Sequence, residues 1–134
     1  MDKEIHMENK ENKHEIKQGA IYWLSMTRCG YNDKMRPYMV VSNNRHNIGA
    51  SDVNIVPLTT SDKRLDLPCN VSVGCLVQVG KPCVARCSEI TTVRRDRLTA
   101  DNWCGQADES TIRSVAEAIA AQVAVAMQTN DKEA

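Results

Sequence analysis

The sequence has no phenylalanine, and aromatic residues make up only 4% of its 134 residues. A hydrophobic core must therefore be built mainly from Val, Ile, Leu, Ala and Met. No apolar run approaches the roughly 20 residues that a membrane-spanning helix needs. The first residues are charged rather than apolar, so we expect no signal peptide either. A cytoplasmic protein is the expectation that follows.

The chain also lacks an excess of charge of either sign, because 17 Lys and Arg balance 17 Asp and Glu. This balance excludes a uniformly basic surface for nucleic acid, but it leaves room for a local basic patch. The length fits one domain, which can bury enough surface to fold without a disulfide or a structural metal.

Cysteine, which is rare in most proteins, occurs six times in the chain. Cys83 and Cys87 form the only close pair, and a zinc site usually needs two such pairs. No histidine lies near them. Free thiols that pack as small hydrophobic groups are the better interpretation. We therefore expect no metal and no cofactor.

The chain divides into a charged segment and a body. Residues 1–16 are mostly charged or amide side chains and are predicted to form a flexible tail. Residues 17–134 are predicted to form one domain, which opens with many short β-type segments joined closely enough to pair antiparallel. Pro37 should mark a strand start and Pro57 an edge strand or a bulge, because proline cannot donate to a ladder.

One strong helical signal lies over residues 107–128, where apolar side chains recur at helical spacing. Asp108 is placed to cap this helix, with Glu109 in its first turn. The apolar stripe is expected to lie on the sheet, and it comprises Ile112, Val115, Ala116, Ile119, Ala120, Val123, Ala124 and Met127. The predicted architecture is mainly β with α: a small barrel-like sheet of antiparallel strands covered by a C-terminal helix.

Two apolar runs, RPYMVVSN at 36–43 and NIVPLTT at 54–60, end in polar residues and lie close together in sequence. With GAIYWLSM at 19–26 before them and VARCSEI at 84–90 after them, their order resembles the MazF/PemK toxins. These are ribonucleases of toxin–antitoxin modules, and the resemblance covers about residues 17–127. It implies an SH3-like barrel with a C-terminal helix, a homodimer, and metal-independent cleavage of single-stranded RNA. It also implies neutralisation by an antitoxin protein whose tail lies in the RNA groove.

Cleavage by the 2′-hydroxyl of the RNA itself needs a base, a proton donor and positive charge near the phosphorane. The resemblance implies catalytic roles for Arg36, Thr59 and Arg86. Arg36 matches the family's Arg-Pro motif, Thr59 matches the hydroxyl that follows the second strand, and Arg86 matches an Arg that the PemK branch is thought to use as proton donor. Because a guanidinium has a pKa above ~12, clamping the phosphorane suits Arg86 better than giving up a proton.

Three positions depart from the PemK pattern: Ser88 replaces an Asp, Glu89 replaces a Gln, and Tyr31 replaces a loop His. The general base is therefore not at its usual position, and Asp33 or Glu89 could take its place. Supporting roles are predicted for Thr60 and Ser88. Contacts to RNA are predicted for Tyr31, Arg28, Asn43 and Arg45.

Other polar and aromatic residues give weaker signals. Arg94, Arg95 and Arg97 could extend an RNA track or simply face water. Trp23 and Tyr38 are assigned to the core, although aromatic side chains also stack on bases in single-strand binders.

Two alternative functions are open. The missing carboxylate and His favour a relative that binds RNA or an antitoxin without efficient cleavage. The gyrase-poisoning CcdB toxins share the fold class and act through the end of the C-terminal helix, where a Trp lies near the terminus. Here Trp103 precedes the helix and the chain end carries no aromatic residue, which argues against gyrase.

Overall fold

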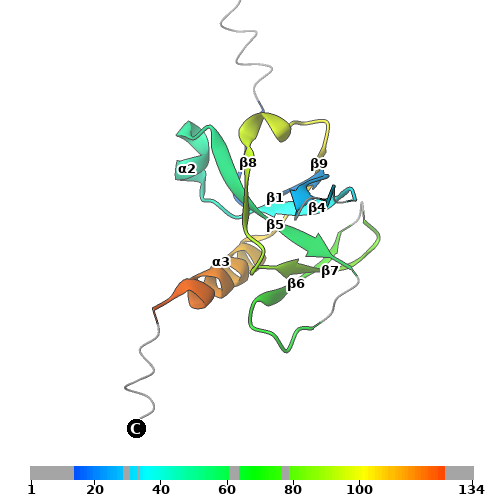
Figure 1. Ribbon diagram of the computed structural model, residues 1–134, viewed down its shortest axis with the longest axis vertical. Coiled ribbons are helices and arrows are strands. Elements are labelled where there is room, and N and C mark those ends of the chain that lie inside the picture. The colour runs from blue at the N-terminus through cyan, green and yellow to red at the C-terminus, as the bar shows by residue number, and fades with distance from the viewer. Residues whose placement is uncertain (1–13, 29–30, 33, 61–63, 77–78, 126–134) are drawn as a thin grey trace, which may run out of the picture.

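A computed structural model describes residues 14–28, 31–32, 34–60, 64–76 and 79–125 of the chain. Its strands form a curled seven-stranded sheet in the order β6-β7-β5-β4-β1-β9, with β8 also pairing with β5 (Figure 1). Every strand pair is antiparallel. The strands are β1 (Ala20–Leu24), β4 (Arg36–Val40), β5 (Asp52–Thr59), β6 (Asn70–Leu76), β7 (Lys81–Arg86), β8 (Thr91–Arg94) and β9 (Trp103–Gln106).

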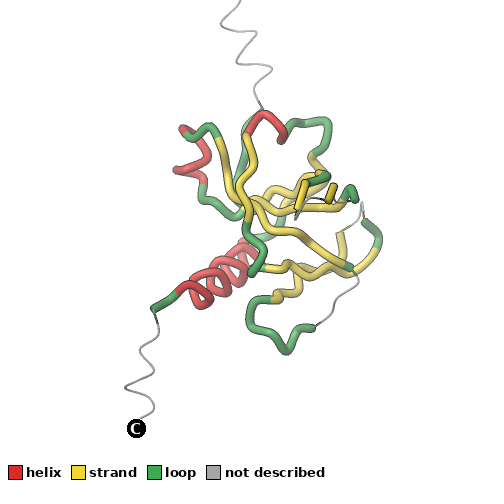
Figure 2. The backbone as a smooth tube through the Cα atoms, viewed as in Figure 1, coloured by secondary structure: helices red, strands yellow, loops and turns green. Residues whose placement is uncertain are grey.

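Of the remaining elements, α3 follows the last strand and the others lie in the connections between strands (Figure 2). A separate two-stranded ribbon is formed by β2 (Thr27–Arg28) and β3 (Tyr31–Asn32). The helices are α2 (Asn44–Gly49), the 3-10 turn η1 (Arg95–Arg97) and α3 (Glu109–Val123). Neither the short helix α2 nor the edge strand β9 was predicted from the sequence.

The strand β5 is central, which makes the edge-strand or bulge prediction for Pro57 wrong. One side of β5 pairs with β4, while the other pairs first with β8 through Asp52–Ile55 and then with β7 through Leu58–Thr59. The carbonyl of Asn54 accepts from Val41 on the β4 side, so strand alternation turns the nitrogen of Pro57 to the other side. Pro57 therefore lies where β5 changes partner, and its missing N–H interrupts neither ladder.

Side chains alternate between two core clusters, as the period of a strand requires. One cluster contains Tyr22, Tyr38 and Ile55, and the other contains Met39 and Leu58. The assignment of Tyr38 to the core is confirmed. Trp23 is only half-buried against the second cluster, on the face opposite to Tyr22.

The helix α3 is confirmed, and so is its cap. The carboxylate of Asp108 accepts a backbone N–H of the first turn at 2.8 Å. Val115 is buried against the second core cluster, but Val123 is 66% exposed and Val125 is 84% exposed. The expectation that the whole apolar stripe lies on the sheet is therefore wrong for its second half, because the helix runs past the body (Figure 1). Met127 lies outside the described residues.

Of the helices in the described part of the chain, none has the length and apolar character that crossing a bilayer requires. Most of the predicted tail, residues 1–13, lies outside the described residues. Its last three residues pack on the body: the ring of His14 hydrogen-bonds the hydroxyl of Tyr22, and Ile16 is buried in the first core cluster. The boundary between tail and domain stays a prediction.

Candidate active site

An open groove of about 340 Å³ lies at one end of the sheet, where β1 ends, β4 begins and β5 ends. It is lined by Trp23, Lys34, Met35, Arg36, Pro37, Leu58, Thr59, Thr60 and Val79. It therefore combines a guanidinium, an ammonium and two hydroxyls with an apolar wall. Arg36, Thr59 and Thr60 were predicted from the sequence. Lys34 and Met35 were missed, although their place directly before the Arg-Pro pair was a usable signal.

Strand register explains why Arg36 and Thr59 meet in this groove. In the β4–β5 ladder Tyr38 pairs with Pro57. Continuing that antiparallel register by two residues sets Arg36 opposite Thr59. Directly opposite residues share one face of a sheet, with Cβ atoms about 4.5–5.5 Å apart. The groove therefore joins the start of one run to the end of the other, whereas the polar residues that end the two runs lie at opposite ends of this antiparallel pair. The chemical roles of Arg36 and Thr59 stay predictions.

Arg86 ends β7 on the same face of the sheet but does not line the groove. In the β5–β7 ladder Thr59 pairs with Val84, so Arg86 is the diagonal neighbour of Thr59. Such neighbours lie about 7–8 Å apart, which a long side chain can span. The sheet therefore brings Arg86 within reach of the Arg36–Thr59 pair without placing it in the groove wall.

A hydrogen-bonded turn joins Arg86 to Glu89. The backbone N–H of Glu89 donates to the carbonyl of Arg86 at 3.0 Å, and the side chains form an ion pair with Nε 2.8 Å from Oε2. Both side chains are partly buried, at 37% and 25% exposure. The ion pair directs the carboxylate of Glu89 toward the guanidinium of Arg86. Glu89 is thus better placed to orient Arg86 than to serve as the missing base.

Ser88 is exposed in the same turn. The other base candidate, Asp33, lies outside the described residues. The side chains of Arg28 and Tyr31 also lie outside them, so their predicted contacts to RNA stay predictions.

Asn43 and Arg45 are not brought to the groove. They follow β4 at its far end, and the five residues of that strand span about 13 Å between its first and last Cα at a rise of about 3.3 Å per residue. The side chain of Asn43 instead caps α2, accepting the backbone N–H of His46 at 2.9 Å. Arg45 lies exposed in α2. The chain leaves the groove along β4, so these two residues lie away from Arg36 and Thr59. Their predicted contacts to RNA stay predictions.

The arginines after β8 have structural partners. Arg95 donates to two backbone carbonyls at the end of α2, at 2.6 and 2.8 Å, and Arg97 donates to the carbonyl of Ser25 at 2.9 Å. Arg94 pairs with Asp96 at 2.8 Å on the surface. Arg95 and Arg97 thus hold connecting segments in place. This structural role differs from both interpretations drawn from the sequence, an RNA track and side chains that simply face water.

Three of the six thiols pack as small hydrophobic groups, as predicted. Cys83, Cys87 and Cys104 are buried in the second core cluster. Burial raises the pKa of Cys87 and of Cys104 to about 11. Within the described ranges, no three His, Cys, Asp or Glu side chains gather as a metal site would require.

A family model described as PemK-like, MazF-like toxin of type II toxin–antitoxin system matches residues 17–123. No curated protein sequence matches the chain.

Several solved structures share the fold. MazF-mt6, a toxin of Mycobacterium tuberculosis, has a TM-score of 0.60 at 22% identity, covering 76% of this chain and 93% of its own. An endoribonuclease in complex with its cognate antitoxin, from a mycobacterial species, has a TM-score of 0.63 at 24% identity, covering 82% and 96%. MazF from Deinococcus radiodurans has a TM-score of 0.65 at 18% identity, covering 84% and 100%. The expected fold class is confirmed.

Proposed function

Because the chain belongs to the family of PemK-like, MazF-like toxins of type II toxin–antitoxin systems, we propose that it is an endoribonuclease that cuts single-stranded RNA. One structural neighbour is an endoribonuclease in complex with its cognate antitoxin, and we extend both the activity and the antitoxin partner to this chain. The substrate implies action in the cytoplasm. The observation that supports the proposal most is the groove that Arg36 and Thr59 line together, where β4 begins and β5 ends.

Each residue has a role that fits its chemistry. The guanidinium of Arg36 offers paired N–H donors to the oxygens of the scissile phosphate, and its charge stabilises the phosphorane. The hydroxyl of Thr59 can donate to a phosphate oxygen or accept from the 2′-hydroxyl. Arg86, oriented by Glu89, adds a second cation from the neighbouring strand. In this scheme the attacking 2′-oxygen displaces the 5′-oxygen and leaves a 2′,3′-cyclic phosphate, with no metal ion taking part.

The apolar part of the groove has a role as well. Trp23 is half-buried there and Met35 is 61% exposed. Bases of single-stranded RNA stack on such surfaces without a strict sequence requirement. Lys34 adds a positive charge at the rim of the same groove. The groove therefore suits an extended strand whose phosphate lies at Arg36 and whose base lies against the apolar wall.

The second candidate is a protein that binds RNA or an antitoxin but cleaves poorly. It is favoured by the ion pair of Glu89 with Arg86, because that pairing occupies one of the two carboxylates that could replace the missing base. The groove geometry is the same in both cases. Only a cleavage assay separates the two candidates.

The test is cleavage of a mixed-sequence RNA in EDTA, followed by mapping of the new ends. We expect ends with 2′,3′-cyclic or 3′-phosphate, loss of cleavage in Arg36→Ala, and reduced cleavage in Thr59→Val. Arg94→Ala is the matched control, because it removes an exposed arginine that pairs with Asp96 away from the groove. Binding without any cut at high protein concentration would favour the second candidate. Cleavage that survives Arg36→Ala would refute the assigned site.

We also propose that the protein is a homodimer, as its family resemblance implies. Sedimentation at micromolar concentration should give the mass of two chains. A persistent monomer would rule out a groove shared between two subunits. Addition of the cognate antitoxin should stop cleavage and form a stable complex.

A further inference from the structure

Cys69 and Cys87 lie directly across from each other where β6 begins and β7 ends. Asn70 pairs with Arg86 in the β6–β7 ladder, so the next pair outward is Cys69 with Cys87. The backbone N–H of Cys87 donates to the carbonyl of Cys69 at 2.8 Å. The two residues therefore occupy a hydrogen-bonded antiparallel position, where side chains project from the same face.

This backbone arrangement matches the span of a disulfide. Opposite residues of a hydrogen-bonded antiparallel pair have Cα atoms about 5.5 Å apart, and disulfides most often join Cα atoms about 5.5–6 Å apart. The two thiols are reduced in this structure. We propose that Cys69 and Cys87 form a thiol modification site, which a peroxide converts into a reversible intramolecular disulfide.

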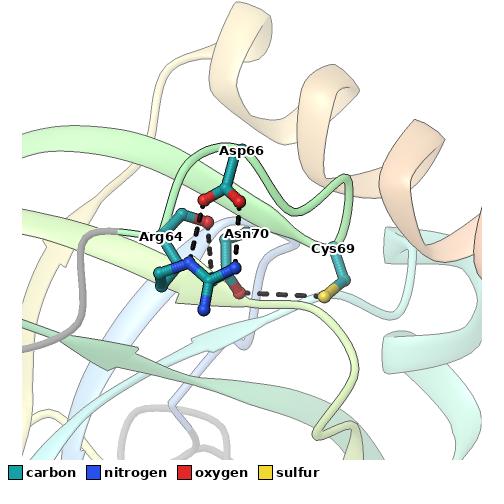
Figure 3. Close-up of polar contacts among 4 residues, drawn as sticks. All are labelled: Arg64, Asp66, Cys69 and Asn70. Atoms are coloured by element: carbon teal, nitrogen blue, oxygen red, sulfur yellow. Dashed lines mark hydrogen bonds and ion pairs between the residues drawn. The ribbon is translucent and has the colours of Figure 1, made fainter.

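The two thiols differ in access, which assigns their order of reaction. Cys69 is half-buried at the end of the loop that carries Arg64 and Asp66, with its sulfur 3.8 Å from the amide oxygen of Asn70 (Figure 3). Cys87 is buried, and its sulfur lies 3.9 Å from a backbone carbonyl. Burial, and next the proximity of Cys69, raise the pKa of Cys87 to about 11. Cys69 therefore meets the oxidant first, and Cys87 resolves the product.

The reaction balances in two steps. The thiol of Cys69 gives up its proton, and its sulfur attacks one oxygen of the peroxide; the O–O bond breaks, Cys69 becomes a sulfenic acid, and the departing hydroxide takes up the released proton to form water. The sulfur of Cys87 then attacks the sulfur of Cys69, the S–S bond forms, and the S–O bond breaks with loss of a second water. Two thiols are oxidised by two electrons, and one hydrogen peroxide is reduced to two waters. A dithiol reductant restores both thiols.

A second pair of thiols lies in the core cluster that contains Cys87 and serves as a comparison. Cys83 and Cys104 are also close enough to affect each other electrostatically, but they belong to β7 and β9, which are not neighbours in the sheet. Both are almost fully buried. With no half-exposed member to receive the oxidant, this second pair should stay reduced under conditions that link Cys69 to Cys87.

The test treats the folded full chain with hydrogen peroxide and measures its intact mass. Formation of the link removes the mass of two hydrogen atoms, and a dithiol reductant returns them. Trypsin cuts after Arg64, Arg86 and Arg94, so the disulfide should join peptide 65–86 to peptide 87–94. The readout does not involve RNA, so its failure is distinct from failure of the proposed ribonuclease activity.

Variants assign the sulfurs, because peptide 65–86 also carries Cys75 and Cys83. Cys69→Ser changes a half-buried residue outside the core and should abolish the link with the fold unchanged by circular dichroism. Cys104→Ser should keep it. A link from Cys87 to Cys75 or Cys83 would overturn the proposal. So would over-oxidation of Cys69 with Cys87 still a free thiol.

Discussion

Replacing Gly19 by alanine should destabilise the protein more than the same substitution at Gly49, Gly74 or Gly80. Gly19 has φ +89°, and a Cβ there would meet Cγ1 of Ile112 at 2.7 Å and the side-chain nitrogen of Gln106 at 2.8 Å. The backbone cannot easily move away, because the N–H of Gly19 donates to Val40 at 2.8 Å and its carbonyl accepts from Ala107 at 2.9 Å. The new methyl group would therefore be forced between the first strand and α3.

The expected cost has two parts. A side chain in the left-handed region costs about 1–2 kcal/mol, and overpacking a filled site costs about 1–3 kcal/mol. Together Gly19→Ala should lose about 2–5 kcal/mol, a large share of the 5–15 kcal/mol typical of a folded domain. Denaturant unfolding followed by fluorescence of Trp23 and Trp103 measures this loss.

Two other glycines separate the parts of that cost. Gly74 has φ +82° with nothing within 4 Å of an added Cβ, so Gly74→Ala carries only the backbone strain. Gly49 meets nothing within 4 Å and has no positive φ, so Gly49→Ala should be neutral or stabilising by up to about 1 kcal/mol. Adding Ile112→Ala to Gly19→Ala should recover part of the packing penalty. If Gly19→Ala cost no more than Gly74→Ala, the argument from close approach would be refuted.

Three further predictions concern charged and titrating groups. Glu89→Gln keeps an oxygen beside Arg86 but removes a negative charge next to the proposed phosphate path. KM for RNA should therefore fall several-fold with kcat little changed, and an unaltered KM would contradict this. Burial raises the pKa of Tyr22 to about 12 from 10.0, an effect partly offset by the charge of Arg95. The folded state therefore keeps a proton that the unfolded state loses, and stability should fall by about 2–3 kcal/mol between pH 10 and pH 12; Tyr22→Phe, followed by urea unfolding at each pH, should flatten that fall. The N–H of Thr111 holds the pKa of Asp108 below its usual range. The contribution of Asp108 to folding stability is therefore present above the ordinary carboxyl pKa and is lost as pH falls through the lowered value. Asp108→Ala should lower Tm at neutral pH but not in strong acid.

The sequence predicts best those features that depend on neighbouring residues. Asp108 caps α3 because a side-chain oxygen reaches an N–H three residues on, and such local bonding is visible in sequence. The family resemblance predicted that Arg36 and Thr59 share a site, and the antiparallel pairing of β4 with β5 accounts for their meeting in one groove. The ion pair of Arg86 with Glu89 was missed although its spacing is local, because both residues had been considered only for chemistry.

Features that depend on distant segments could not be predicted in the same way. Pro57 looked like an edge residue, but it lies where β5 exchanges one partner strand for another, which no local pattern reveals. Strand β9 depends on the open edge of β1, a strand from the opposite end of the domain in sequence. The cap that Asn43 provides for α2 was not predicted either, because α2 itself was not expected.

The register between β4 and β5 has a consequence for how such a site can change over time. A slip of one residue would turn every side chain of β5 to the wrong face, and β5 supplies residues such as Ile55 and Leu58 to both core clusters. The core therefore enforces the alignment, and neither Arg36 nor Thr59 is needed to maintain it. Substitutions at the groove can alter chemistry or base preference while the frame stays constant. A fold arranged in this way lets a toxin diverge in what it cuts without having to refold its site.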